Sequence, residues 1–259
     1  DPPAPLPDVV SAPAGSFDDR RAKFVISDPL LVRDHDFKSG TADAIRYYVL
    51  VGMDDPTISL FGQEFSVGLK SVAIYVPANP SGNLVMHTHE EVAKGLAALP
   101  QSSLELVKAV NVEPAANPAD AYWAQEYNTP GFASYMTAGK SGIISIYPDV
   151  NGFPQEELDG TFIHETGHIW SNTNWGTSHD DARWDDWRNA IASDGNYVSQ
   201  YAQASIGEDF SETLQHYHQV LGTPAEAAAR RDMPARIEIL DEIYKEVNRE
   251  ATASTKYKL

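Results

Sequence analysis

The sequence contains no cysteine, which excludes disulfide bonds, cysteine nucleophiles and every zinc site built on thiolates. Basic residues are also scarce, because 19 Lys and Arg stand against 37 Asp and Glu and give a net charge of −18. This balance argues against a nucleic-acid partner, since DNA and RNA binding depends on Lys and Arg that neutralise phosphates. No apolar run comes near the roughly 18 residues that a membrane-spanning helix needs, so we expect no membrane span.

The order of the expected elements predicts an α+β fold. Runs of β-branched and aromatic residues predict strands at 44–52, 66–76 and 142–147. Pro148 ends the last of these, which makes it the candidate edge strand. Thr88 with Glu three residues later predicts a capped helix over 88–98. Helical patterns follow at 162–171, 180–192, 206–221, 224–231 and 234–250. We expect an N-terminal mixed α/β lobe with an edge strand, a C-terminal helical lobe, and a cleft between them.

Composition divides the chain into three stretches. Residues 1–21 carry five prolines within the first 13 positions, and we expect a disordered leader there. Residues 22–84 are β-rich and have no role that the sequence reveals. Residues 85–259 hold the motifs that carry chemistry.

The segment TFIHETGHIW at 161–170 contains a His-Glu-x-x-His motif. On a helix, His164 and His168 share a face one turn apart, so both imidazoles can reach one zinc ion at about 2.0–2.1 Å. Glu165 lies beside the first of them and would take a proton from a zinc-activated water. Gly167 would let another element approach closely. A chance match is expected in roughly one or two chains per hundred, so the motif predicts a catalytic zinc site.

A catalytic zinc takes three protein ligands, and two stretches could supply the third. The stretch GTSHDD at 176–181 is similar to the aspartate element of aspzincins and offers His179 or Asp180. The stretch GEDFSE at 207–212 offers Glu208 and Glu212, which lie four apart on one helical face. Glu208 would bind the metal, and Glu212 would accept the second ring N–H of a ligand histidine. We favour the second stretch, and the first remains an alternative.

The stretch YAQASIGEDFSET at 201–213, placed after HETGH, resembles the catalytic domain of anthrax lethal factor and its relatives, which include the clostridial Pro-Pro endopeptidases. The resemblance covers roughly residues 85–250 and implies a zincin-type catalytic domain of the gluzincin group over residues 85–259. It also implies that Glu208 is the ligand, that Glu212 follows it one turn later, and that the Tyr201 phenol assists catalysis. Tyr197 is a rival for the phenol role.

We therefore predict a secreted, extracellular zinc metalloendopeptidase, a hydrolase that cleaves peptide bonds of protein substrates through a zinc-activated water. The cofactor would be Zn2+, the partner a peptide or protein substrate, and the enzyme a monomer. The substrate backbone would add to the edge strand at 142–147. Two alternatives remain: a catalytically idle, zinc-stabilised binding or adhesion module on the same scaffold, and an aspzincin-like protease with its third ligand near Asp180.

Overall fold

The computed structural model describes residues 24–26, 30–33, 44–53, 57–60, 63–66, 70–78 and 82–244. The expected leader at 1–21 lies outside these residues. So does the end of the helix expected over 234–250, which is described as far as residue 244.

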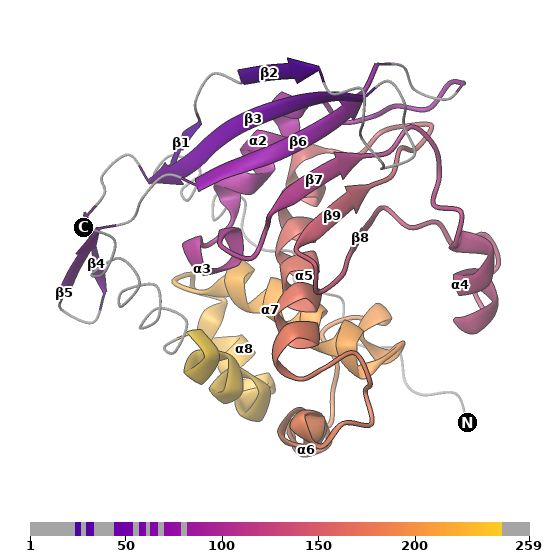
Figure 1. The fold of residues 1–259 in the computed structure, drawn as a ribbon. Helices are drawn as coiled ribbons and strands as arrows, with labels where there is room; N and C mark the ends of the chain where they lie inside the picture. The colour runs from indigo at the N-terminus through magenta and orange to yellow at the C-terminus, as the bar shows by residue number, and fades with distance from the viewer. Residues whose placement is uncertain are drawn as a thin grey trace.

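A mixed sheet forms one layer of the protein (Figure 1). Its strand order is β1-β3-β6-β7-β9-β8, and β2 also pairs with β3. The strands are β1 (Phe24–Ile26), β2 (Leu30–Arg33), β3 (Ala44–Met53), β6 (Lys70–Pro77), β7 (Ala109–Val112), β8 (Met136–Ala138) and β9 (Ile143–Ile146). Strands β6, β7 and β9 run parallel to one another, whereas the other pairs in the sheet are antiparallel. A separate hairpin consists of β4 (Thr57–Leu60) and β5 (Gln63–Ser66).

The edge of the sheet does not lie where the sequence predicts it. Strand β9 pairs with β7 on one side and with β8 on the other, so the prediction that 142–147 forms the edge strand is wrong. Among the described strands, β8 ends the order, with Met136 opposite Ile146 and Ala138 opposite Ile144. A three-residue strand has too short a hydrophobic alternation to stand out in the sequence, which is why β8 was not expected.

The strands expected at 44–52 and 66–76 correspond to strands of the sheet in whole or in part. The strand at 44–52 is confirmed as β3. The run at 66–76 begins with the last residue of β5 and includes β6 from Lys70, and residues 67–69 lie outside the described residues. The sheet continues across the expected boundary at residue 85, because Ala73 of β6 lies opposite Ala109 of β7. Residues 22–84 thus contribute strands to the same sheet as the later part of the chain.

Helices cover the sheet and fill the second half of the chain (Figure 1). They are α2 (His89–Ala98), α3 (Gln101–Leu104), α4 (Asp120–Glu126), α5 (Gln155–Asn174), α6 (Asp185–Asp194), α7 (Ile206–Val220) and α8 (Glu226–Asp232), followed by a helix over 234–244. Two 3-10 turns, η1 (Ala182–Trp184) and η2 (Tyr201–Gln203), precede α6 and α7. Helix α5 extends beyond the expected 162–171 at both ends, and α4 was not expected. The protein is thus mixed α and β, as predicted.

Local signals in the sequence fix several helix ends. The Thr88 backbone N–H donates to Glu91 at 2.8 Å, and the Glu91 N–H donates to the Thr88 hydroxyl at 3.2 Å. This capping box satisfies two backbone donors at the start of α2, as the sequence predicts. Helix α6 ends at Asp194 and is capped by Gly195, whose φ of 69° is the left-handed conformation that glycine adopts without a steric cost.

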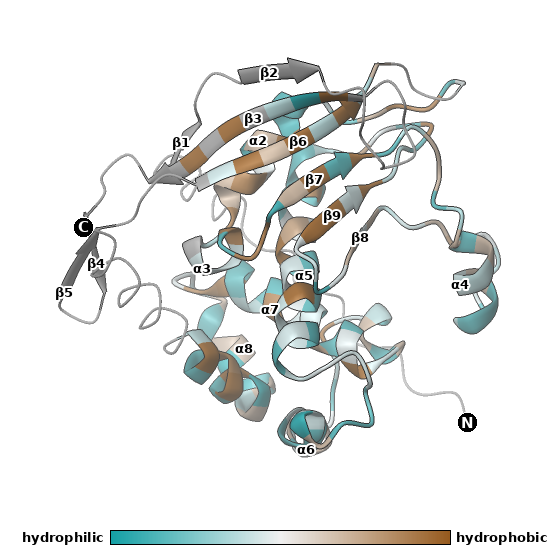
Figure 2. Ribbon diagram, in the orientation of Figure 1, coloured by the Kyte–Doolittle hydropathy of each residue, from teal (hydrophilic) through white to brown (hydrophobic). Residues whose placement is uncertain are grey.

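Two apolar clusters form the interior. The first joins the sheet to α2 and α5 and includes Ile74, Ile144 and Phe162. The second joins α6, α7, α8 and the last helix and includes Trp187 and Phe210. Figure 2 shows the apolar residues of the first cluster as brown segments on β6, β7 and β9. No helix in the described part of the chain is long and apolar enough to cross a membrane.

Candidate metal centre

Helix α5 presents the two motif histidines toward α7. His164 and Glu165 are each 5% exposed, and the Nε2 atoms of His164 and His168 lie 3.1 Å apart. The opposite side of this helix turn packs into the first apolar cluster through Ile163 and Ile169. The amphipathic turn therefore fixes both imidazoles on one face, as the spacing of the motif predicts.

Helix α7 brings Glu208 to the same point. Glu208 Oε2 lies 3.1 Å from His164 Nε2 and 3.2 Å from His168 Nε2. The Glu208 position is set by the start of α7, because its backbone N–H donates to the hydroxyl of the N-cap residue Ser205 at 3.1 Å. Gly167 permits the close approach of α7, since a Cβ on Gly167 would lie 2.9 Å from Ser211 Oγ.

The three side chains fit a zinc ion. Their donor atoms form a nearly equilateral triangle, and ligand atoms about 2.1 Å from one tetrahedral ion lie about 3.4 Å apart. Two imidazoles and one carboxylate are also the donors that zinc takes in catalytic sites. Among the described residues, His164, His168 and Glu208 are the one group of this kind with convergent ligand atoms.

Glu212 orients His164 through the ring nitrogen that does not face the triangle. Its Oε1 accepts a hydrogen bond from Nδ1 of His164 at 2.8 Å, while the other ring nitrogen, Nε2, forms a corner of the triangle. Its Oε2 accepts a hydrogen bond from the Ser199 hydroxyl at 2.6 Å, and the Ala202 backbone N–H donates to that hydroxyl at 3.0 Å. The turn that carries Tyr201 is thereby tied to His164. Ser199 was not expected, because a single serine in a loop carries no periodic or spacing signal.

The charges of the centre favour a cation. Burial alone would lower the pKa of His164, but hydrogen bonds to Glu208 and Glu212 outweigh burial and raise this pKa to about 10. Burial would raise the pKa of Glu208, yet the two histidines hold it well below its usual range. The Glu208 carboxylate therefore stays ionised beside the two imidazoles.

Glu165 is poised beside the triangle. Burial raises the pKa of its carboxyl, although the nearby histidines lower it in part. Its Oε2 is buried and makes no hydrogen bond to any described residue. Burying a carboxyl oxygen without a hydrogen-bond partner costs folding free energy. We therefore infer that Glu165 Oε2 contacts a ligand or a reacting molecule.

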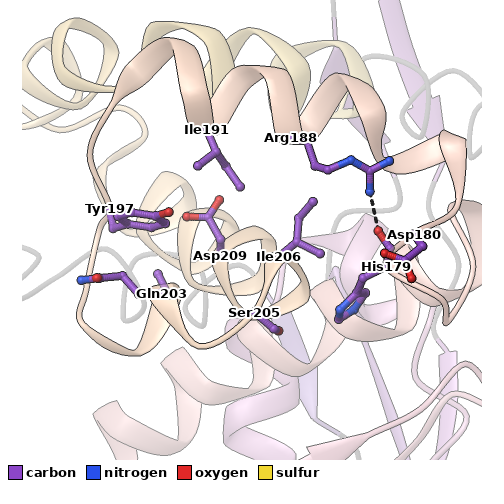
Figure 3. A pocket seen from close by; sticks show the side chains of 10 residues that line it. His179, Asp180, Arg188, Ile191, Tyr197, Gln203, Ser205, Ile206 and Asp209 are labelled. Carbon is purple, nitrogen blue, oxygen red and sulfur yellow. Dashed lines mark hydrogen bonds between the residues drawn. The ribbon is translucent and has the colours of Figure 1, made fainter. Parts of the chain in front are cut away.

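Tyr201 and Tyr197 occupy different places. The Tyr201 ring is 6.1 Å from the His164 ring, and the residue is 39% exposed. Partial burial raises the pKa of Tyr201, and the charge of Glu208 raises it further, so its phenol stays protonated. Tyr197 instead lines a cavity of about 530 Å³ together with Gln203 of η2 (Figure 3). Tyr201 is therefore the phenol that faces the triangle.

The alternative third ligand lies by that same cavity. Asp180 and His179 line it together with Arg188 of α6, whose guanidinium donates to the His179 carbonyl (Figure 3). Asp180 does not belong to the convergent group among the described residues. Asp209, the neighbour of Glu208, also lines the cavity (Figure 3), and its carboxylate accepts hydrogen bonds from Trp187 and Arg236.

A partly exposed row of aromatic rings leads away from the centre and was not expected. The Tyr127 ring is 6.3 Å from Tyr201, and the Trp123 ring stacks on Tyr127 at 5.4 Å. These residues lie on or next to α4, which buries none of its own residues. The aromatic content of this stretch is visible in the sequence, but its proximity to Tyr201 depends on the fold.

The chain matches no protein-family model, and no curated protein matches it. Its chemistry is therefore inferred from the motif, the distances and the charges described above.

Proposed function

We propose that the protein is a zinc-dependent endopeptidase. The observation that carries the proposal is the triangle of His164, His168 and Glu208 donor atoms, with a buried, unpartnered Glu165 oxygen beside it. A closed structural site would have no use for that carboxyl or for an exposed phenol next to the ligands. A bound zinc ion would supply Lewis acidity toward the water and the scissile carbonyl.

The chain's own residues would move the protons. Glu165 would accept a proton from the attacking water at Oε2 and pass it to the nitrogen of the leaving amine, a task suited to a carboxyl with a raised pKa. The Tyr201 phenol would donate a hydrogen bond to the oxyanion that develops on the carbonyl. Glu212 would hold His164 in the required tautomer, supported by Ser199.

The substrate would bind as an extended strand along β8. This strand ends the described sheet order, and α5 packs against it. The Ala138 backbone also lies close enough to the Glu165 carboxylate to lower its pKa. A peptide paired with β8 would therefore pass over the reacting groups. This assignment replaces the expected binding at 142–147.

The proposal extends to the fold. The two apolar clusters are consistent with a zincin-type arrangement, in which the sheet with α2 and α5 forms one lobe and α6 to the last helix forms the other. The active-site cleft would lie between them. The positions of Tyr201, Glu208 and Glu212 around His164 support the resemblance to the lethal factor family.

The test compares wild type with Glu165→Gln on a mixed peptide library, with zinc content measured for each protein. Glu165→Gln should keep its zinc and lose about 10²–10⁴-fold in kcat/KM, because the proton acceptor is gone. Glu156→Gln, at an exposed position of the same helix, is the matched control and should cleave as wild type does. Equal cleavage by wild type and Glu165→Gln would refute the mechanism. A zinc-loaded wild type that cleaves nothing would favour the binding or adhesion module.

A further inference from the structure

A fully buried guanidinium links the last helix to both sides of the metal centre. Arg236 is 0% exposed, and its Nε donates to Asp194 Oδ2 at 3.0 Å. Its Nη1 donates to Asp209 Oδ2 at 2.7 Å, and its Nη2 donates to the carbonyl and the side-chain oxygen of Asn196, both at 2.7 Å. Each nitrogen of the fork thus has an acceptor, and the acceptors come from three different parts of the chain.

The first of these parts is the start of α7, which carries the candidate metal ligand Glu208. Asp209 is the residue after Glu208 in the first turn of α7. Its Oδ2 accepts from Arg236, and its Oδ1 accepts from the indole N–H of Trp187 at 2.9 Å. With both oxygens engaged on this side, the helix turn is held in the rotation that directs Glu208 to the histidines.

The second part leads into Tyr201. Asn196 lies in the segment between α6 and η2, and its side-chain N–H donates to the Asp232 carbonyl at 2.6 Å. Arg236 also lies over the Tyr197 ring, 6.0 Å from its centroid. The segment is therefore fastened to the last helix just ahead of the turn that presents Tyr201.

The third part is the end of α6. The Asp194 carboxylate accepts hydrogen bonds from the backbone N–H groups of Ala235 and Arg236 at 2.9 and 3.2 Å. These two N–H groups lie in the first turn of the last helix, where they have no acceptor within the helix. Asp194 also ends α6, so the last helix cannot shift without moving α6. A buried ion pair adds little net stability compared with apolar packing, so its value lies in fixing one arrangement.

We propose that Arg236 is a positioning residue of the metal centre, which sets Glu208 through Asp209 and Tyr201 through Asn196. The proposal has two arms. The Glu208 arm, the positioning of Glu208 through Asp209, requires only that the site binds zinc. The Tyr201 arm, the positioning of Tyr201 through Asn196, rests on the proposed peptidase function.

The test replaces Arg236 with lysine in the full chain. Arg236→Lys keeps the charge, but a single ammonium cannot span the same acceptors. We expect the zinc Kd, measured by competition with a chromophoric chelator, to rise about 10–100-fold, as for other residues that orient metal ligands. The visible spectrum of the Co2+-substituted protein should change as well, because it reports ligand geometry.

Leu240→Ala is the matched control. Leu240 is buried on the same helix and contributes to the second apolar cluster, and its hydrocarbon side chain makes no hydrogen bond to the guanidinium network. It should lower thermal stability but leave the zinc Kd and the Co2+ spectrum at wild-type values. If Arg236→Lys fails to fold, Asp209→Asn carries the same test, since it keeps the shape and removes the charge. A wild-type zinc Kd and Co2+ spectrum in the folded variant would overturn the proposal.

Asn196→Ala isolates the Tyr201 arm. It should lower kcat by about tenfold, through misplacement of the phenol, while KM and the zinc Kd stay unchanged. An unchanged kcat would overturn this arm. If wild type binds zinc but cleaves no peptide, the peptidase proposal fails, and the zinc Kd of Arg236→Lys still decides the Glu208 arm.

Discussion

Two neighbouring carboxylates at the start of α7 take opposite directions. Glu208 faces the histidines, whereas Asp209 is turned to Trp187 and Arg236. Successive residues of a helix point about 100° apart, so a turn whose position is fixed by one residue also fixes the direction of the next. Which of these two acids faces the histidines is therefore determined by the packing of α7.

The ligand assignment can be checked by removing each candidate acid. Glu208→Gln should lose about 10²-fold or more in zinc affinity, since an amide oxygen is a weaker ligand than a carboxylate. Asp180→Asn should bind zinc as wild type does, because Asp180 lies outside the convergent group. Isothermal titration of zinc into each protein gives the comparison, and the reverse order of affinities would move the third ligand to Asp180.

Glu113, after β7, makes stability depend on pH. Burial raises the pKa of its carboxyl, although the Ser145 hydroxyl, which donates to Oε1 at 3.0 Å, lowers it in part. A raised folded-state pKa means that the neutral form is favoured on folding, so stability falls as pH rises above about 4.5 toward the folded pKa. Glu113→Gln should therefore raise Tm at about pH 7.5 and leave it unchanged at about pH 4.

Thermal melts at the two pH values measure this effect. Glu126→Gln, at an exposed position of α4, is the control and should leave Tm near the wild-type value at both. A Glu113→Gln protein that gains nothing at the higher pH would show that the carboxyl is adequately solvated.

At the scale of elements, the contact of α5 with α7 determines the distance between the histidines and Glu208. A methyl group on Gly167 would lie 2.9 Å from Ser211 Oγ, 3.1 Å from Ser211 Cα and 3.2 Å from Leu214 Cδ2. The Ser211 backbone cannot yield as a flexible side chain can. Any residue larger than glycine therefore pushes the helices apart.

Gly167→Ala should destabilise the protein by about 1–3 kcal/mol and weaken zinc binding, because α7 must move away from the histidines. The sign of this change in unfolding free energy is informative, because alanine in a helix interior is normally more stabilising than glycine by about 1 kcal/mol. Urea unfolding and zinc titration provide the measurements. Gly139→Ala, where an added Cβ meets nothing within 4 Å, is the control, and equal results for both variants would contradict this account.

Elements set by local signals could be predicted from the sequence, and the sheet order could not. The capping box at Thr88 and the amphipathic pattern of α7 are contained within a few residues, and both predictions are confirmed. The position of β8 at the end of the strand order depends on pairing between distant segments. The 142–147 run has a stronger strand pattern than Met136–Ala138, which led to the wrong edge.

The candidate site likewise combines residues placed by local sequence motifs with residues placed by contacts between distant segments. The histidines are placed by one helix, and Glu208 and Glu212 by the spacing on another, so the sequence motifs indicate all four. Ser199 and Arg236 act through contacts between segments far apart in the chain. No spacing rule covers such contacts.

At the scale of the whole molecule, the candidate centre lies where the two apolar clusters meet. Leu214 of α7 packs against both clusters, and the three donors come from α5 on one side and α7 on the other. An ion held by all three would therefore join the two halves of the interior. Metal binding should stabilise the fold as a whole rather than one helix.

Adding zinc to metal-free protein should raise Tm, because zinc binds the folded chain and not the dispersed ligands of the unfolded one. The gain is about 2.7 kcal/mol when free zinc is 100 times its Kd. Calorimetry with and without zinc measures it, and a chelator should reverse it. Magnesium, which prefers oxygen ligands, is the control for weak cation binding to a chain of charge −18 and should have little effect. An equal shift with magnesium would contradict binding at the histidines.

The order of the site residues along the chain also sets when the centre can be completed during synthesis. A nascent chain leaves the ribosome from its N-terminal end, so His164 and His168 emerge before Glu208, and Glu208 before Arg236. The sheet and α5 can thus bury their apolar faces while the histidines still lack a carboxylate partner. If Arg236 positions Glu208 as proposed, the three donors reach their final arrangement only after the helix at 234–244 has docked.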